Sequence, residues 1–166
     1  DLNLMEYVVR AAELQPREVV LEIGAGTGGM TSMMAPHVAR VMSIAIDTNM
    51  HAMASQATES CSNVTLLRTD ALKNKNRFSP VVVETLERLL GEVPDPQFKL
   101  VANLPYHVAT PVISNLVASS LPWSLMVVTI QWELALKMVA EPGDANYGAL
   151  AVWLQSQCRV KILKKL

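Results

Sequence analysis

Short apolar runs alternate with helix-like segments along almost the whole chain, and this alternation restricts the fold more than any other feature. The apolar runs are short enough for buried strands and lie at residues 19–23, 41–46, 63–68, 98–102, 125–130 and 160–163. Helical spacing of apolar residues occurs between them, at residues 4–12, 28–38, 49–60, 81–90, 110–119, 132–140 and 147–155. Strands that alternate with helices predict a doubly wound α/β fold with a mostly parallel sheet.

The composition indicates one compact domain over residues 1–166, because 51% of the residues are hydrophobic and 17% are charged. The longest nearly unbroken apolar run, residues 123–130, is too short to span a bilayer. No basic-then-apolar signal segment opens the chain, so we expect a cytoplasmic protein without membrane association. Cys61 and Cys158 lie far apart without C-x-x-C spacing or histidine neighbours, so we expect no metal.

A glycine-rich segment, Glu22-Ile-Gly-Ala-Gly-Thr-Gly28-Gly29, joins the first predicted strand to the next helix. Gly24 and Gly26 permit a tight turn and a close backbone approach to a ligand, and the free N–H groups at a helix start attract anions. Gly24, Gly26 and Gly29 also satisfy the dinucleotide fingerprint, and Asp47 follows about 20 residues later. On this segment alone, a NAD-dependent oxidoreductase is an alternative.

Polar residues also follow three further predicted strands. Asp47 and the segment Asn103-Leu-Pro-Tyr106 come directly after an apolar run, and Asp70 follows one after Thr69. Parallel sheets bind ligands outside the carboxyl ends of their strands, near the point where the strand order reverses. We therefore expect these residues and the glycine segment to lie around one site.

Several strings, in the same order, resemble the ribosomal RNA adenine N6-dimethyltransferase family. They are Glu22-Ile-Gly-Ala-Gly-Thr-Gly28, Asp70-Ala71, Asn103-Leu-Pro-Tyr-His-Val-Ala-Thr-Pro111, Gln131 with Glu133, and Tyr147-Gly148 with Leu150. The resemblance extends over almost the whole chain. It implies a Rossmann-like class I methyltransferase fold, S-adenosyl-L-methionine as the cofactor, and N6-dimethylation of adenines in small-subunit ribosomal RNA by a monomeric protein.

The resemblance also implies roles for individual residues. It assigns the cofactor pocket to Glu22, Gly24, Ala25, Gly26, Gly28, Asp47, Asp70, Ala71 and Asn103. The glycine segment would bind the methionine carboxylate, and Asp70 would accept a hydrogen bond from the cofactor adenine. The target adenine would be held by Asn103, Leu104, Pro105 and Tyr106.

The chemistry of the target suits those last four residues. An adenine amine is a poor nucleophile because its lone pair is delocalised into the ring. The Asn103 side-chain oxygen and the Leu104 carbonyl can accept its N–H groups and aim the lone pair at the methyl group. Pro105 stiffens the turn, and Tyr106 offers a face on which the base can stack.

The chain departs from the family pattern at three places. Ala45 stands where the family has a glutamate that holds the cofactor ribose, and Asp47 lies two residues further on. We therefore expect weaker cofactor binding, with Asp47 as a possible substitute. Trp132 and Ala149 replace basic residues of relatives. The amino-terminal cofactor segment and the carboxy-terminal helical RNA-binding domain are also expected to be absent, so the chain would be truncated at both ends.

Two functions remain as alternatives within this family resemblance. One is a resistance methyltransferase that acts on large-subunit ribosomal RNA. The other is a ribosome-assembly or mitochondrial transcription factor with the same fold and reduced catalysis, which Ala45 favours. Two basic groups, Arg68, Lys73, Lys75 and Arg77, and Arg159, Lys161, Lys164 and Lys165, either contact phosphates or form ordinary solvated surface.

Overall fold

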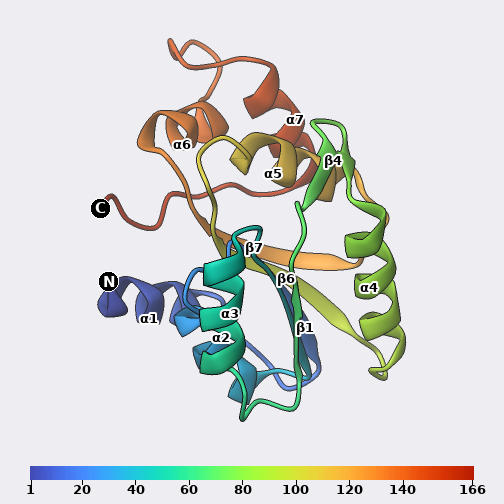
Figure 1. The fold of residues 1–166 in the computed structure, drawn as a ribbon. Coiled ribbons are helices and arrows are strands. Elements are labelled where there is room, and N and C mark those ends of the chain that lie inside the picture. The colour runs from blue at the N-terminus through green and yellow to red at the C-terminus, as the bar shows by residue number, and fades with distance from the viewer.

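The chain folds around one five-stranded sheet in which every strand runs parallel to its neighbours (Figure 1), as described for all residues 1–166 by a computed structural model. The order is β3-β2-β1-β6-β7. The strands are β1 (Glu18–Ile23), β2 (Arg40–Ile44), β3 (Val64–Leu67), β6 (Gln97–Asn103) and β7 (Trp123–Thr129). The chain moves outward from β1 to β3 and then returns to β6 beside β1. The order therefore reverses between β1 and β6, and the expected doubly wound α/β fold is confirmed.

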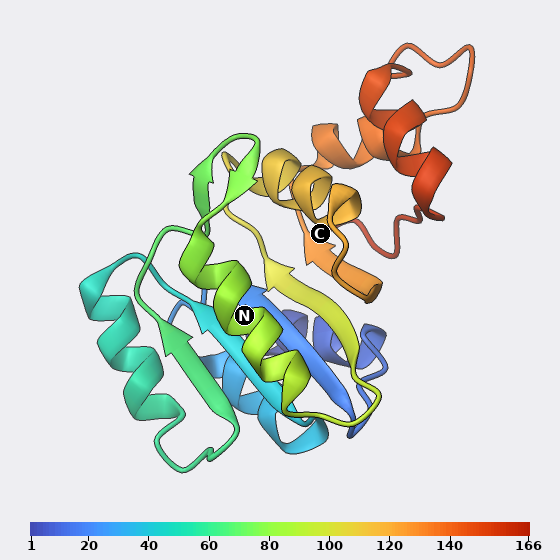
Figure 2. The ribbon, with the colours of Figure 1, turned by 90° about the vertical axis from the view of Figure 1, so that its right-hand side faces the viewer.

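Helices cover both faces of this sheet, with α4 crossing one face in Figure 2 and α1 and α2 lying behind it. The helices are α1 (Leu2–Ala11), α2 (Gly29–Met34), a 3₁₀ turn η1 (Ala35–His37), α3 (Thr48–Ala57), α4 (Pro80–Gly91), α5 (Ala109–Ala118), α6 (Trp132–Val139) and α7 (Ala149–Gln157). Val19 and Leu21 pack in the larger core with α4 and α5, whereas Val20 packs with α1 and α2. Burial on both faces explains why the apolar runs of β1 and β6 are nearly continuous.

A charged pair connects β1 to β6 at the amino-terminal end of the sheet. The Lys99 ammonium lies 2.8 Å from a carboxylate oxygen of Glu18, and both side chains are buried. The same ammonium donates to the carbonyls of Ala12 and Glu13, at 2.8 and 3.0 Å. The Lys99 charge is thus paired with Glu18 and hydrogen-bonded to two carbonyls, and it holds the end of α1 against the β1–β6 pair, although the Glu18 oxygen that faces it has no hydrogen-bond partner.

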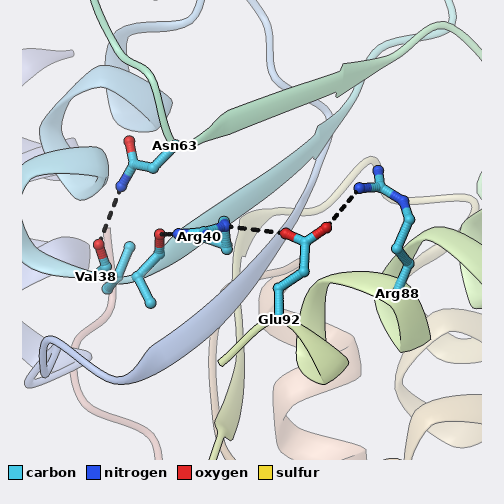
Figure 3. Close-up of polar contacts among 6 residues, drawn as sticks. Val38, Arg40, Asn63, Arg88 and Glu92 are labelled. Atoms are coloured by element: carbon cyan, nitrogen blue, oxygen red, sulfur yellow. Dashed lines mark hydrogen bonds and ion pairs between the residues drawn. The ribbon is translucent and has the colours of Figure 1, made fainter. Parts of the chain in front are cut away.

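A second set of polar contacts lies near the start of β2 (Figure 3). Glu92, which follows α4, accepts from Arg40 at 3.3 Å and from Arg88 at 3.0 Å. Asn63 donates to the carbonyl of Val38 at 3.0 Å. These contacts join β2 to α4 and to the start of β3, although exposed ion pairs of this kind add only about 0.2–1 kcal/mol each.

The lysine-rich segment after β3, which lies outside the predicted strands and helices, contains a hairpin of β4 (Leu72–Asn74) and β5 (Arg77–Phe78). Its turn forms because the Asn74 side chain accepts from the backbone N–H of Asn76 at 2.9 Å. Phe78 is buried in the core, and Asn115 of α5 donates to the Lys75 carbonyl at 3.1 Å. The hairpin is therefore docked, with the cations of Lys73, Lys75 and Arg77 on its exposed surface.

Two other expectations about secondary structure were wrong. Residues 160–163 form no strand, because no neighbouring strand pairs with them. That segment returns toward α1, where the Lys164 ammonium lies 5.3 Å from the centre of the Tyr7 ring. Residues 28–38 form the short α2 and the turn η1 instead of one helix, with Pro36 near the start of η1. No helix has the length and apolarity needed to cross a membrane.

Gly28 permits the close packing of α2 on α3, and its replacement tests this contact. A Cβ on Gly28 would lie 2.8 Å from the Ala54 Cα, and the residue has a φ of 86°. We expect Gly28→Ala to lower the free energy of unfolding by about 3 kcal/mol, from backbone strain and overpacking together. Gly26→Ala is the matched control, because Gly26 also has a positive φ but no atom within 4 Å of the added Cβ. Equal losses in urea denaturation of the two variants would contradict this account.

Candidate functional site

The glycine segment and the Asn103–Tyr106 turn meet where the strand order reverses. Gly24 follows β1 with a φ of 87°, and a Cβ on it would lie 3.5 Å from the Asn103 carbonyl oxygen and 3.6 Å from Cδ of Pro105. The N–H groups of Gly24 and Ala25 both donate to the Ile44 carbonyl at 2.9 Å. The loop is thus anchored to β2 while its glycine backbone faces the turn.

Asn103 is the last residue of β6, and β7 holds it in place. Thr129, its pairing partner on β7, donates a side-chain hydrogen bond to the Asn103 amide oxygen. The N–H of Leu104 donates to the Thr129 carbonyl at 3.2 Å. Asn103 is exposed, and no hydrogen bond within the protein uses the Leu104 carbonyl. Two oxygen acceptors are therefore available side by side at the end of β6.

An aromatic face lies next to these acceptors. Tyr106 is 70% exposed, and the His107 ring meets it edge-on with 5.5 Å between ring centres. Leu104 is buried in the core, so the turn is anchored while Tyr106 projects from it. A flat ring can stack on Tyr106 without any displacement of the core.

Asp70 and Ala71 follow β3 at the same edge of the sheet. One oxygen of the exposed Asp70 carboxylate accepts from the Leu72 N–H at 3.0 Å, and the other has no partner within the protein. Ala71 is buried, and its carbonyl accepts from the Ser79 N–H at 2.9 Å. Asp70 is thus held by the hairpin and keeps one oxygen for a ligand.

Asp47 serves as the N-cap of α3, accepting from the Met50 N–H at 2.8 Å. Strand β2 ends at Ile44, so strand alternation does not place the Asp47 side chain on the same side as residue 45. Ala45 is only 5% exposed and packs with Ala25 and Ala54. No carboxylate is present at position 45, and one oxygen of Asp47 is already used by the cap.

Glu22 lies inside the protein beneath the glycine loop and not on its open surface. It is 1% exposed, and its carboxylate accepts from the hydroxyls of Thr31 in α2 and Ser43 in β2, the latter at 2.7 Å. Burial raises the pKa of Glu22 from 4.5 to about 7, against the opposing effect of the two hydroxyl donors. Sequence reasoning missed Thr31 and Ser43, although a serine in the apolar run opposite Glu22 is a signal for such a bond.

The arrangement suits the binding of two ligands side by side. Gly24 exposes backbone next to the turn and Gly26 exposes backbone further along the loop, Asp70 offers a free carboxylate oxygen, and Asn103 and Leu104 offer acceptors for an amine. No group of three or more His, Cys, Asp or Glu side chains is placed to hold a metal ion. The acceptors on Asp70, Asn103 and Leu104 offer hydrogen bonding and positioning to a nitrogen that carries N–H groups.

The family model described as Ribosomal RNA adenine dimethylase matches residues 1–166. Two similar proteins are both named Ribosomal RNA small subunit methyltransferase A. The one from Moorella thermoacetica is 35% identical over 100% of this chain and 56% of its own length. The one from Pelotomaculum thermopropionicum is 34% identical over 98% of this chain and 54% of its own length. The chain thus spans about half the length of these relatives.

Solved structures are similar as well. A dimethyladenosine transferase from Plasmodium falciparum superposes with a TM-score of 0.74 and 26% identity, over 93% of this chain and 50% of the other. The 23S rRNA methyltransferase ErmE superposes with a TM-score of 0.67 and 22% identity, over 86% of this chain and 51% of the other, and shows likeness of fold alone. The Rossmann-like methyltransferase fold expected from the sequence is confirmed.

The raised pKa of Glu22 predicts a pH dependence of stability. The folded protein keeps a proton on Glu22 between pH 4.5 and about 7, where the unfolded chain releases it. This residue's contribution to stability is therefore lost as the pH rises through that window. We compare the free energy of unfolding of Glu22→Gln with that of wild type at each pH. We expect this difference to be about 2–3 kcal/mol more favourable to the variant at about pH 8 than at about pH 5. Urea denaturation at both pH values measures this gain, and a difference that does not change with pH would refute the buried, protonated carboxyl.

Proposed function

The chain belongs to the ribosomal RNA adenine dimethylase family, and on that premise we propose that the protein transfers methyl groups from S-adenosyl-L-methionine to the N6 amines of adenines in small-subunit ribosomal RNA. The observation that carries the proposal is the contact of the Gly24 loop with the Asn103–Pro105 turn at the reversal of strand order. A methyl donor held by the loop and an adenine held by the turn would be immediate neighbours there.

The turn supplies what an adenine amine requires. The Asn103 amide oxygen and the Leu104 carbonyl accept its two N–H groups, and the ring stacks on the exposed face of Tyr106. Holding both hydrogens favours a pyramidal nitrogen with its lone pair directed at the methyl group. Catalysis is then positioning and electrostatics, and well-oriented reactants gain about 7–11 kcal/mol in favourable cases.

S-adenosyl-L-methionine supplies a methyl group on a positively charged sulfur, and most of the site fits it. Gly24 and Gly26 leave the loop backbone open to the methionine end, and the free oxygen of Asp70 fits the adenine amine. The ribose end fits less well, because Ala45 brings no carboxylate and Asp47 is engaged as a helix cap. We infer that the cofactor ribose is bound weakly, and that the second carboxylate oxygen of Asp47 is the available acceptor for its hydroxyls.

The RNA partner is supported by the exposed cations of the β4–β5 hairpin. Lys73, Lys75 and Arg77 lie on its outer surface and make no ion pair within the protein. The hairpin follows Asp70 and docks on α5, which itself follows the Asn103–Tyr106 turn. These cations are therefore available to phosphates of an RNA whose adenine enters the turn.

A second candidate is a family member that binds ribosomal RNA and assists assembly with little methyl transfer. The buried Ala45 and the capping role of Asp47 favour it, because both weaken the expected ribose contact. Cofactor affinity and transfer rate distinguish the two functions.

Methyl transfer to under-methylated small ribosomal subunits tests the proposal, with radiolabelled cofactor and the protein in its full natural length. We expect label in N6-methylated adenine, and a loss of about a hundredfold in kcat for Asn103→Ala, because one of the two amine acceptors is removed. The melting temperature of the variant serves as the control and should stay near that of wild type, because Asn103 is exposed. Cofactor binding without any transfer by the wild type would support the assembly function instead.

A pair of variants tests the ribose contact of Asp47. Asn caps helices about as well as Asp, so Asp47→Asn keeps the cap of α3 but removes the charge, whereas Asp47→Ala removes both. If Asp47 holds the ribose, calorimetry should show cofactor affinity reduced about tenfold in both variants. Only Asp47→Ala should also lose stability, by about 1 kcal/mol. Unchanged cofactor affinity in Asp47→Asn would exclude Asp47 from the ribose site.

A further inference from the structure

Thr129, at the carboxyl end of β7, contacts both residues that supply the amine acceptors. Its hydroxyl donates to the Asn103 amide oxygen, and its carbonyl accepts the Leu104 N–H at 3.2 Å. Thr129 and Asn103 are also cross-strand partners in the β6–β7 pairing. We propose that Thr129 is a positioning residue that orients the Asn103 side chain for methyl transfer, an inference that rests on the proposed function.

The orientation of the Asn103 amide matters because its two ends have opposite hydrogen-bonding character. The oxygen accepts, whereas the nitrogen carries two donors, and the terminal torsion of asparagine has two broad orientations of similar energy. If the amide turned over, its N–H groups would face those of the adenine amine and repel it. The Thr129 hydroxyl selects one orientation by donating to the oxygen.

The bond from Thr129 leaves the Asn103 oxygen able to bind the substrate. An amide oxygen has two lone pairs, and the hydroxyl uses one of them. Asn103 is exposed at the end of β6, with no other side-chain partner to restrict it. The core holds Leu104 but not the Asn103 side chain. The orientation of the Asn103 amide is therefore set by the hydrogen bond from Thr129.

Two substitutions separate this role from a structural one. Thr129→Val has nearly the same shape and the same preference for a strand, but lacks the hydroxyl. Thr129→Ser keeps the hydroxyl and loses a methyl group. Neither change removes the backbone bond to Leu104, because that bond uses the carbonyl of residue 129.

Steady-state methyl transfer by the full-length protein provides the kinetic test. We expect Thr129→Val to lower kcat about three- to tenfold, the effect of one lost hydrogen bond, with KM for the RNA and the cofactor dissociation constant unchanged. Thr129→Ser should restore the wild-type kcat. In an Asn103→Ala background, Thr129→Val should cause no further loss. An unchanged kcat in Thr129→Val, or an equal loss in Thr129→Ser, would overturn the inference.

A spectroscopic readout keeps this test separate from that of the proposed function. The side-chain NH₂ signals of Asn103, assigned by their disappearance in Asn103→Ala, can be followed by ¹⁵N NMR without any turnover. We expect them to shift or broaden in Thr129→Val and to keep their positions in Thr129→Ser. If the wild type transfers no methyl group, the proposed function fails, and this spectrum still decides the orienting role. Signals unchanged in Thr129→Val would refute that role.

Discussion

The parallel pairing of β1 with β6 is the constraint on which the site depends. Along the chain, β2 and β3 come between β1 and β6 and lie on the other side of β1. The loops that leave β1 and β6 therefore diverge at one point of the sheet edge. Gly24 leaves β1 there, and Asn103 ends β6 there. At the opposite end, the buried Lys99–Glu18 pair holds the same two strands together. The site is therefore a consequence of strand order, which brings its two halves together.

The polar residues of the site divide into those that hold it and those that face a ligand. Glu22, Thr31 and Ser43 form a closed set of hydrogen bonds under the glycine loop. Because the Glu22 carboxyl is buried and its pKa is raised, it stabilises the loop best when it is protonated. Asn103 and Tyr106 are exposed, as residues that contact a substrate must be. The interior thus fixes the course of the glycine loop, whereas the exposed residues of the turn are the ones that we propose to contact the substrate.

Sequence patterns predicted the fold well because strands buried on both faces leave nearly continuous apolar runs, as at residues 19–23 and 98–102, which contain only one charged residue each. They failed at residues 160–163, where an apolar run has no strand to pair with, and at the hairpin, whose turn depends on the side chain of Asn74. The meeting of Gly24 with Asn103 followed from the general rule for strand ends. The orienting contact of Thr129 did not, because it depends on the β6–β7 register, which no local motif encodes.

The central claim is that the glycine loop and the Asn103–Tyr106 turn form one site for a methyl donor and an adenine. A crystal structure of the full-length protein with S-adenosylhomocysteine and adenosine tests it most directly. The account predicts the adenine amino nitrogen within about 3 Å of the Asn103 amide oxygen and of the Leu104 carbonyl, with the ring on Tyr106. An adenosine bound with its amine directed away from both oxygens, beside an occupied glycine loop, would contradict it.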